Sequence, residues 1–135
     1  MRVLVDTSIW SLALRRAKPK VDHLVEEFEE LIREGRVVTM GPIRQELLSG
    51  IKSEKQYQTL RDHLRAFPDL PLVNEDYEEA ALCFNLCRAR GIQGSNTDFL
   101  ICAVAIRRQL PVFTADKDFE HYKGVLPLLL HRVRS

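Results

Sequence analysis

The sequence lacks most of the features that mark specialised classes of protein. It has only 3 cysteines in 135 residues, and none of them forms a C-x-x-C pair, so neither a disulfide framework nor a structural zinc site is expected. We expect Cys83, Cys87 and Cys102 to be buried, reduced thiols. A G-x-G-x-x-G loop is also absent, which argues against a dinucleotide-binding protein.

Long apolar runs are missing as well. The longest run covers residues 125–130 and falls well short of the ~20 residues that span a bilayer. The first apolar stretch, residues 3–5, ends at Asp6, too early to form the apolar core of a secretory signal. We therefore expect a cytoplasmic protein with no membrane association.

An excess of charge of either sign is the third absence. The chain has 20 Lys and Arg against 19 Asp and Glu, a net charge of +1, and 45% of its residues are hydrophobic. This composition excludes a disordered polyanion or polycation. It also lacks the bulk positive charge that usually marks a nucleic-acid-binding module. Any affinity for nucleic acid must therefore come from where the charges lie.

Short apolar segments and amphipathic segments alternate along what we expect to be a single domain, residues 1–135. The alternation predicts a parallel sheet covered by helices on both faces, an α/β fold. The apolar spacing turns one face of the helix at 75–90 inward, namely Tyr77, Ala80, Ala81, Phe84 and Cys87. The expected strands are 2–5, 37–40, 72–73, 111–114 and 126–130, and the expected helices are 7–16, 19–35, 42–50, 53–67, 75–90, 98–109 and 117–122.

Four acidic residues lie where an open parallel sheet binds ligands, at the carboxyl ends of its strands. Asp6 directly follows the first predicted strand, and Asp116 follows the strand at 111–114. Glu46 is in the second turn of the helix that leaves the second strand, and Asp98 begins the helix that leads into 111–114. Each has an ordinary alternative, which is helix capping for the three aspartates and a solvated helix position for Glu46.

The four acids together indicate a metal site. Carboxylates gathered at one sheet edge repel each other unless a cation neutralises them, and oxygen ligands without Cys or His favour Mg²⁺ or Mn²⁺ over zinc. Such a metal can bind a phosphate oxygen and activate a water for in-line attack. Asp118 is a fifth candidate ligand, with a solvated helix position as the alternative. Neighbouring polar residues could orient metal-bound water or simply cap helices, namely Thr7, Ser8, Asn96 and Thr114.

The segments that carry these residues resemble the PIN-domain ribonucleases, and among them the VapC toxins of VapBC toxin–antitoxin pairs. The matching segments are VLVDTSIW at 3–10, QELLSG at 45–50, NTDFLICAVA at 96–105 and TADKDF at 114–119. Their order and spacing match across essentially the whole chain. The resemblance implies a three-layer α/β/α sandwich with Mg²⁺- or Mn²⁺-dependent endoribonuclease activity.

The same resemblance implies which residues and partners the activity involves. It implies that Asp6, Glu46, Asp98 and Asp116 bind the metal, with Asp118 as a further ligand. It also implies a homodimer, and inhibition by a small VapB-type antitoxin that docks over the site. The first helices and the helix after residue 42 are the expected walls of the antitoxin groove.

An RNA substrate would need basic side chains close to the acidic cleft. The candidates are Arg44, two residues before Glu46, and Arg15 and Arg16 at the far end of the first helix. An ordinary solvated cation is the alternative for each. If four acids belong to a metal site, the remaining surface carries 20 basic against 15 acidic residues, so the net charge of +1 hides a moderately basic protein.

Two other functions fit parts of the pattern. One is a PIN-fold binding module with weak or no catalysis that acts with its antitoxin as an autoregulatory repressor, although the intact set of acids argues against it. The other is a phosphate-accepting receiver domain, which also holds Mg²⁺ in an acidic pocket. A receiver would want a pair of acids after the first strand and a lysine after a late strand, where this sequence has only Asp6 and then Asp116.

Overall fold

The computed structural model describes residues 1–14 and 22–134. No helix within these two ranges is long and apolar enough to cross a bilayer. In chain order the elements are β1 (Val3–Val5), α1 (Thr7–Leu14), α2 (His23–Arg33), β2 (Val37–Val38), α3 (Gly41–Leu48), α4 (Glu54–Leu64), α5 (Asn74–Ala89), α6 (Asn96–Arg108), β3 (Val112–Phe113) and α7 (Asp118–Lys123).

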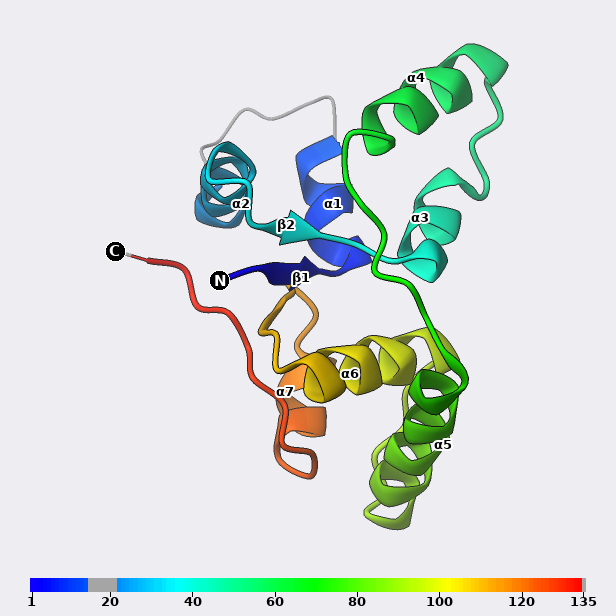
Figure 1. The fold of residues 1–135 in the computed structure, drawn as a ribbon, viewed down its shortest axis with the longest axis vertical. Coiled ribbons are helices and arrows are strands. Elements are labelled where there is room, and N and C mark those ends of the chain that lie inside the picture. Colours follow the sequence, from blue (N-terminus) through cyan, green and yellow to red (C-terminus); the bar gives the residue numbers. More distant parts are fainter. Residues whose placement is uncertain (15–21, 135) are drawn as a thin grey trace.

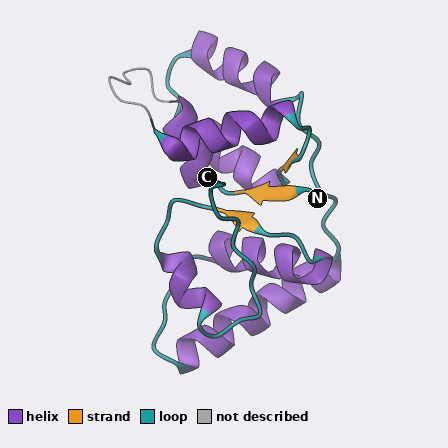
Figure 2. Cartoon of the chain, turned by 90° about the vertical axis from the view of Figure 1, so that its left-hand side faces the viewer, coloured by secondary structure: helices purple, strands orange, loops and turns teal. Residues whose placement is uncertain are grey.

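The three strands form a parallel sheet in the order β2-β1-β3. Helices α1 to α4 lie on one side of the sheet and α5 to α7 on the other, so the strands form the middle layer (Figures 1 and 2). The prediction of an α/β/α sandwich with a central parallel sheet is therefore confirmed. Because all strands run the same way, their carboxyl ends meet at one edge, which is where ligands bind in such sheets.

The central strand β1 is buried on both faces, since Val3, Leu4 and Val5 have no exposed surface. This explains why its sequence is a continuous apolar run and does not alternate with polar residues. The backbone N–H of Asp6 still donates to the carbonyl of Phe113, at 3.0 Å, so the ladder continues one residue past the strand. Asp6 is thereby fixed at the carboxyl edge of the sheet.

Helix α6 is the most deeply buried helix of the described chain, with every residue from Phe99 to Ala105 buried. Its partner α5 contributes two of the three buried free thiols, and α6 contributes the third, Cys102. Burial raises the pKa of Cys83 to about 11 and that of Cys102 further, so the thiols stay protonated. The prediction of buried, reduced cysteines is confirmed.

Two predicted strands are reduced to single bridges. Residues 72–73 form no strand, and the pairing falls instead at Asp69, which bridges to Thr39. Only Leu130 of the segment 126–130 pairs, with Val112. Proline explains the second case, because Pro127 lies inside the segment 126–130 and lacks the N–H group that a ladder needs. The expected start of the second helix at residue 19 lies outside the described residues, and α2 begins at His23 after the N-cap Asp22.

The inward face of α5 also differs from the prediction. Tyr77 and Ala81 were expected to point inward but are exposed, Tyr77 by 54%, whereas Asp76 has no exposed surface. Asp76 is buried because two arginines of α6 reach it, with Arg107 Nη1 at 2.5 Å and Arg108 Nη1 at 2.8 Å from its Oδ1. Its Oδ2 accepts two more hydrogen bonds, from the backbone N–H of Val73 and from Arg108 Nη2. An apolar periodicity cannot reveal an acid whose burial depends on partners about 30 residues away.

These bonds determine the charge state of Asp76. The Arg108 hydrogen bonds, together with those from Val73 and Arg107, hold the pKa of the Asp76 carboxyl well below its usual value despite burial. The ion pairs join the first turn of α5 to the last turn of α6, the two helices that pack most extensively against each other. Asp76 therefore has a structural role, and it shares no hydrogen-bond partner with the acids at the strand ends.

Candidate metal centre

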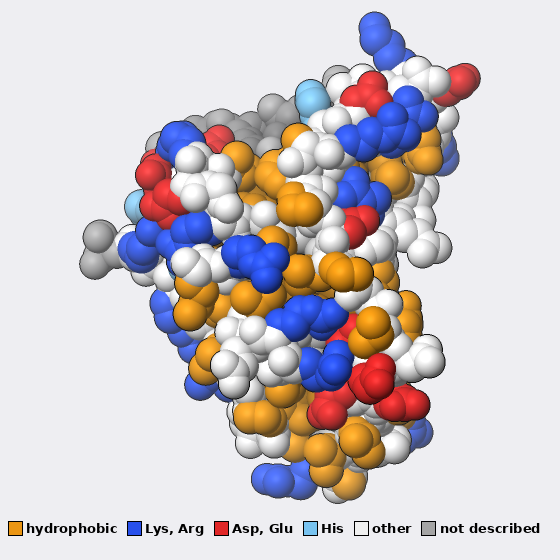
Figure 3. Space-filling view, in the orientation of Figure 1, with side chains coloured by type: hydrophobic (Ala, Val, Ile, Leu, Met, Phe, Trp, Pro, Cys, Tyr) orange, Lys and Arg blue, Asp and Glu red, His pale blue; other side chains and the backbone are white. Residues whose placement is uncertain are grey.

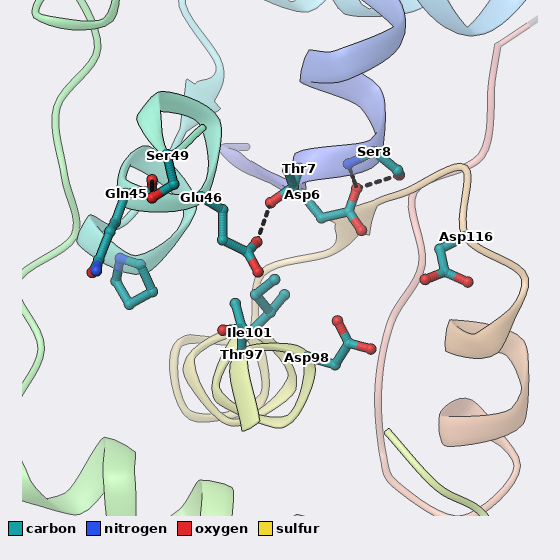
Figure 4. A pocket seen from close by; sticks show the side chains of 11 residues that line it. Asp6, Thr7, Ser8, Gln45, Glu46, Ser49, Thr97, Asp98, Ile101 and Asp116 are labelled. Atoms are coloured by element: carbon teal, nitrogen blue, oxygen red, sulfur yellow. Dashed lines mark hydrogen bonds between the residues drawn. The ribbon is translucent and has the colours of Figure 1, made fainter. Parts of the chain in front are cut away.

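Four acidic side chains from four separate segments line one cavity at the carboxyl edge of the sheet (Figure 4). Asp6 follows β1, Glu46 lies on α3, Asp98 on the first turn of α6, and Asp116 between β3 and α7. The cavity measures about 640 Å³. Its remaining lining residues are Thr7, Ser8, Pro42, Gln45, Ser49, Thr97 and Ile101.

Asp6 is held rigidly at the back of the cavity and is only 4% exposed. Its Oδ1 accepts hydrogen bonds from the backbone N–H of Ser8, at 3.0 Å, and from the Ser8 hydroxyl, at 2.5 Å. Its Oδ2 accepts one from the Thr114 hydroxyl at 2.8 Å. Burial raises the pKa of Asp6, and these hydrogen bonds only partly oppose that shift.

Asp116 belongs to the same hydrogen-bonded unit. Its backbone N–H donates to Thr114 Oγ1 at 2.9 Å, and Thr114 in turn donates to Asp6. Its side-chain Oδ1 accepts the backbone N–H of Asp118 at 2.9 Å, as a helix-capping acid does. Asp6 caps α1 in the same way through Ser8. Asp6 and Asp116 therefore each accept a backbone hydrogen bond at the start of a helix and also line the cavity.

Glu46 enters from α3, on the opposite side of the cavity from Asp116 in Figure 4. Its Oε1 accepts a hydrogen bond of 2.7 Å from the hydroxyl of Thr7, the first residue of α1. This bond joins α1 to α3 and directs the Glu46 carboxylate toward the space between Asp6 and Asp98 (Figure 4). The position of Glu46 in the cavity thus depends on a side chain from another helix.

Asp98 lies on the floor of the cavity in the first turn of α6. The Ser95 hydroxyl accepts its backbone N–H at 3.0 Å, which caps the helix, and the Tyr122 hydroxyl donates to its Oδ2 at 2.8 Å. Burial raises the pKa of Asp98, and the negative charges of Asp116 and Glu46 raise it further, against the lowering effect of Tyr122 and Ser95. The charges of Asp116 and Glu46 thus act directly on Asp98.

The donor set fits a hard divalent cation. Within residues 1–14 and 22–134, none of the four acids has a lysine, arginine or histidine within ion-pair distance. Unpaired carboxylates in a shared cavity need a cation to offset their repulsion, and oxygen donors suit Mg²⁺ or Mn²⁺. As the side chains stand, no three acidic, histidine or cysteine groups of the described chain converge on one point. A cation bound here would require some of these side chains to move or to act through water, as Mg²⁺ sites commonly allow.

Several predicted site residues lie elsewhere. Asn96 lines a neighbouring cavity together with Tyr77. Residues two apart on a helix point in directions about 200° apart, and on α6 it is Asp98 that faces the acidic cavity. Arg44 points away from Glu46 for the same reason and forms a bidentate ion pair with Asp69. Neither Asn96 nor Arg44 lines the acidic cavity, so we do not include them in the proposed site.

One further candidate is also outside the cavity. Asp118 does not line it, and its largely exposed side chain lies 4.0 Å from His121. Arg15 and Arg16 lie outside the described residues. By contrast, Thr7, Ser8 and Thr114 each donate a hydrogen bond to one of the strand-end or helix acids.

Sequence reasoning missed five residues that line the cavity, namely Pro42, Gln45, Ser49, Thr97 and Ile101, and one residue that bonds to a site acid from outside it. Tyr122, on α7, is fully buried and donates to Asp98 from a position 24 residues further along the chain. The available signal was weak, since a buried tyrosine hydroxyl generally needs a hydrogen-bond partner, but the sequence does not say which.

The chain is similar to known proteins over most of its length. The sequence pattern of the PIN domain matches residues 3–125. VapC ribonuclease Mb1587 of Mycobacterium bovis and ribonuclease VapC11 of Mycobacterium tuberculosis are each 30% identical to the chain over 124 residues, covering 87% of it and 89% of the relative.

Solved structures share the fold. VapBC2 from Rickettsia felis, solved with a DNA fragment from its promoter, superposes with a TM-score of 0.77 at 19% identity, over 97% of this chain and 98% of that one. FitAcB from Neisseria gonorrhoeae gives a TM-score of 0.75 at 22% identity, over 96% of both chains.

Proposed function

The chain belongs to the PIN domain family and, within it, to the VapC ribonucleases, and on that premise we propose that it is a metal-dependent endoribonuclease, the toxin of a toxin–antitoxin pair. One observation carries the proposal: four carboxylates from separate segments line a single cavity, with no cationic partner among the described residues. A site of this kind attracts a divalent cation, and a cation is what allows an acidic cavity to accept a phosphodiester.

Asp6, Glu46, Asp98 and Asp116 would hold Mg²⁺ or Mn²⁺ in this cavity. When bound, the metal supplies a Lewis acid for the phosphate and a more acidic water as nucleophile. Asp6 is fixed by Ser8 and Thr114 and so provides a rigid anchor. We leave Asp118 out of the proposed set because it lies outside the cavity.

The hydroxyl groups of the site position the acids. Thr7 holds the longer and more mobile Glu46 side chain in the cavity, whereas Ser8 and Thr114 each occupy one oxygen of Asp6. Thr114 also accepts the backbone N–H of Asp116, so the two strand-end acids share one support. A carboxylate that is held in this way loses little freedom on ligand binding, which favours both affinity and a defined geometry.

The direct test uses the purified, antitoxin-free protein and total cellular RNA. We expect discrete cleavage products with Mg²⁺ or Mn²⁺ and none with excess chelator, because without the cation the cavity repels the phosphodiester. Products would be resolved on denaturing gels. Cleavage that persists in chelator would contradict the metal mechanism. A complete lack of cleavage with either metal would favour the alternative, a PIN-fold module that acts with its antitoxin as an autoregulatory repressor.

We propose that a VapB-type antitoxin binds in a groove between α1, α3 and α4. This groove measures about 770 Å³ and has apolar walls that include Leu14, Leu47 and Leu60. It shares Thr7 and Glu46 with the acidic cavity, so a segment lying in it would reach the metal site. The apolar walls suit the nonpolar face of a small helical partner.

We further propose that the protein forms a homodimer through the exposed surface of α5. Leu82 and Leu86 lie one helical turn apart and are 56% and 54% exposed. Apolar side chains also gather over the end of the molecule where α5 lies (Figure 3). Exposed apolar residues that cluster in this way are typical of protein interfaces.

Replacing Leu86 by glutamate is expected to shift the protein from dimer to monomer, because burying a new charge at an apolar interface opposes association. Light scattering coupled to size-exclusion chromatography would measure the mass. Leu129→Glu is a matched control, since Leu129 is also 54% exposed but lies outside α5. A Leu86→Glu protein that stays dimeric would contradict the assignment of this surface.

We place the activity in the cytoplasm, where cellular RNA is available. The three reduced, buried cysteines are consistent with a reducing compartment.

A further inference from the structure

Tyr122 is a buried polar residue that directly contacts the proposed metal site. Its side chain has no exposed surface, and its hydroxyl lies 2.8 Å from Oδ2 of Asp98. The phenol donates this hydrogen bond, since a carboxylate oxygen can only accept. One oxygen of the Asp98 carboxylate is therefore held by Tyr122, and the remaining lone pairs of the carboxylate are available to the cavity.

The ring of Tyr122 has almost no freedom to turn away. The rings of Phe99 and Phe119 pack against it, with centroids 5.0 Å and 5.1 Å distant. On a third side, a β-carbon built on Gly94 would overlap the phenol oxygen, so only glycine leaves room for the hydroxyl there. The position of the hydroxyl is thus determined by packing on several sides and not by Asp98 alone.

The bond also joins two parts of the site that come from different elements. Asp98 is on α6, whereas Tyr122 is on α7, the helix whose first residue, Asp118, donates its backbone N–H to Asp116. A shift of α7 would therefore move Asp116 and the partner of Asp98 together. Tyr122 thus connects the helix that follows Asp116 to the helix that carries Asp98.

We infer that Tyr122 is a positioning residue, which holds the Asp98 carboxylate toward the cavity in the orientation that a divalent cation requires. The inference rests on the proposed metal site. Its physical basis is that the negative charges of Asp116 and Glu46 favour rotation of Asp98 away from the cavity, and the phenol opposes this rotation. Hydrogen-bond partners of metal ligands in general raise metal affinity by fixing the ligand.

The test measures metal affinity without any catalytic assay. Mn²⁺ binding to the purified, antitoxin-free protein would be followed by the electron paramagnetic resonance signal of free Mn²⁺. Tyr122→Phe removes one oxygen atom and keeps the ring packing, so we expect it to weaken Mn²⁺ binding by about tenfold or more. Tyr57→Phe is the matched control, because Tyr57 is a partly exposed residue on α4, and its Mn²⁺ affinity should equal that of the wild type.

A double-mutant cycle separates positioning from a general structural role. If Tyr122 acts through Asp98, then Tyr122→Phe should have little further effect on the Mn²⁺ affinity of the Asp98→Asn protein. Gly94→Ala provides a second route, since the new methyl group displaces the phenol without removing it. It should weaken Mn²⁺ binding in the same way as Tyr122→Phe. Urea unfolding in chelator would show that the variants remain folded.

The possible outcomes distinguish this inference from the proposed function. An unchanged Mn²⁺ affinity in Tyr122→Phe, with wild-type binding intact, would overturn the role of Tyr122 and leave the metal site standing. Equal losses in the wild-type and Asp98→Asn backgrounds would also overturn it, since the effect would then not pass through Asp98. Failure of the wild type to bind Mn²⁺ would overturn both.

Discussion

Replacing Asp6 or Asp98 by asparagine is expected to reduce metal-dependent RNA cleavage by on the order of 100-fold to 1,000-fold, the range seen when one electrostatic group is removed from an active site. Each change removes a negative charge that would hold the cation, and leaves a neutral amide of nearly the same shape. Initial rates on a labelled RNA, at saturating Mg²⁺ or Mn²⁺, would measure the loss.

The fold should survive both changes, which makes the loss of rate interpretable. Asparagine is as good a helix N-cap as aspartate, so Asp6→Asn can keep its bonds to Ser8 at the start of α1. Circular dichroism and thermal unfolding would verify this. Asp118→Asn is the matched control, because Asp118 lies outside the cavity, and its rate should stay close to that of the wild type. Undiminished cleavage by Asp6→Asn or Asp98→Asn would exclude the mechanism.

The largest expected effect on stability comes from Asp76, far from the metal site. Asp76→Asn should lower the free energy of unfolding by roughly 2–4 kcal/mol, because it removes a buried charge that accepts bonds from two arginines. Urea unfolding monitored by circular dichroism would measure it. Asp62→Asn is the control, since the Asp62 side chain is 60% exposed and pairs only at the surface, where the loss should stay below about 1 kcal/mol.

The effect of Asp76 should depend on pH in a defined direction. Its pKa is lowered by folding, so the carboxylate binds fewer protons in the folded than in the unfolded state near its ordinary pKa of about 4. The stability it contributes is therefore complete above that value and is lost as the pH falls toward the depressed pKa. The stability difference between the wild type and Asp76→Asn should shrink from pH 5 downward. A difference that stays constant to about pH 3 would contradict the ion-pair interpretation.

The sequence was sufficient to place the four acids at one edge of the sheet, because that placement follows from strand order and from a general rule for parallel sheets. The lining of one cavity by Asp6, Glu46, Asp98 and Asp116 agrees with it. Whether they bind metal stays a prediction.

Expectations based on nearness in the sequence were less successful. Arg44 was chosen because it is close to Glu46 along the chain, yet on a helix that spacing turns it to the opposite side, where Asp69 binds it. A second difficulty arises on α5. Apolar periodicity favoured Tyr77 for the inward position, but Asp76, which is paired with Arg107, is the buried residue. Tyr122 reaches Asp98 only through the packing of α6 against α7, a contact between elements that no local pattern encodes.

The dispersal of the acidic cavity along the chain has a consequence during synthesis on the ribosome. Asp6 and Glu46 are made well before Thr114, Asp116 and Tyr122. The third strand, which fixes the backbone of Asp6, is also late. A nascent chain that stops before residue 114 has only part of the cavity. The proposed nuclease would therefore be harmless to the ribosome and messenger that produce it until residues 114–122 have been made.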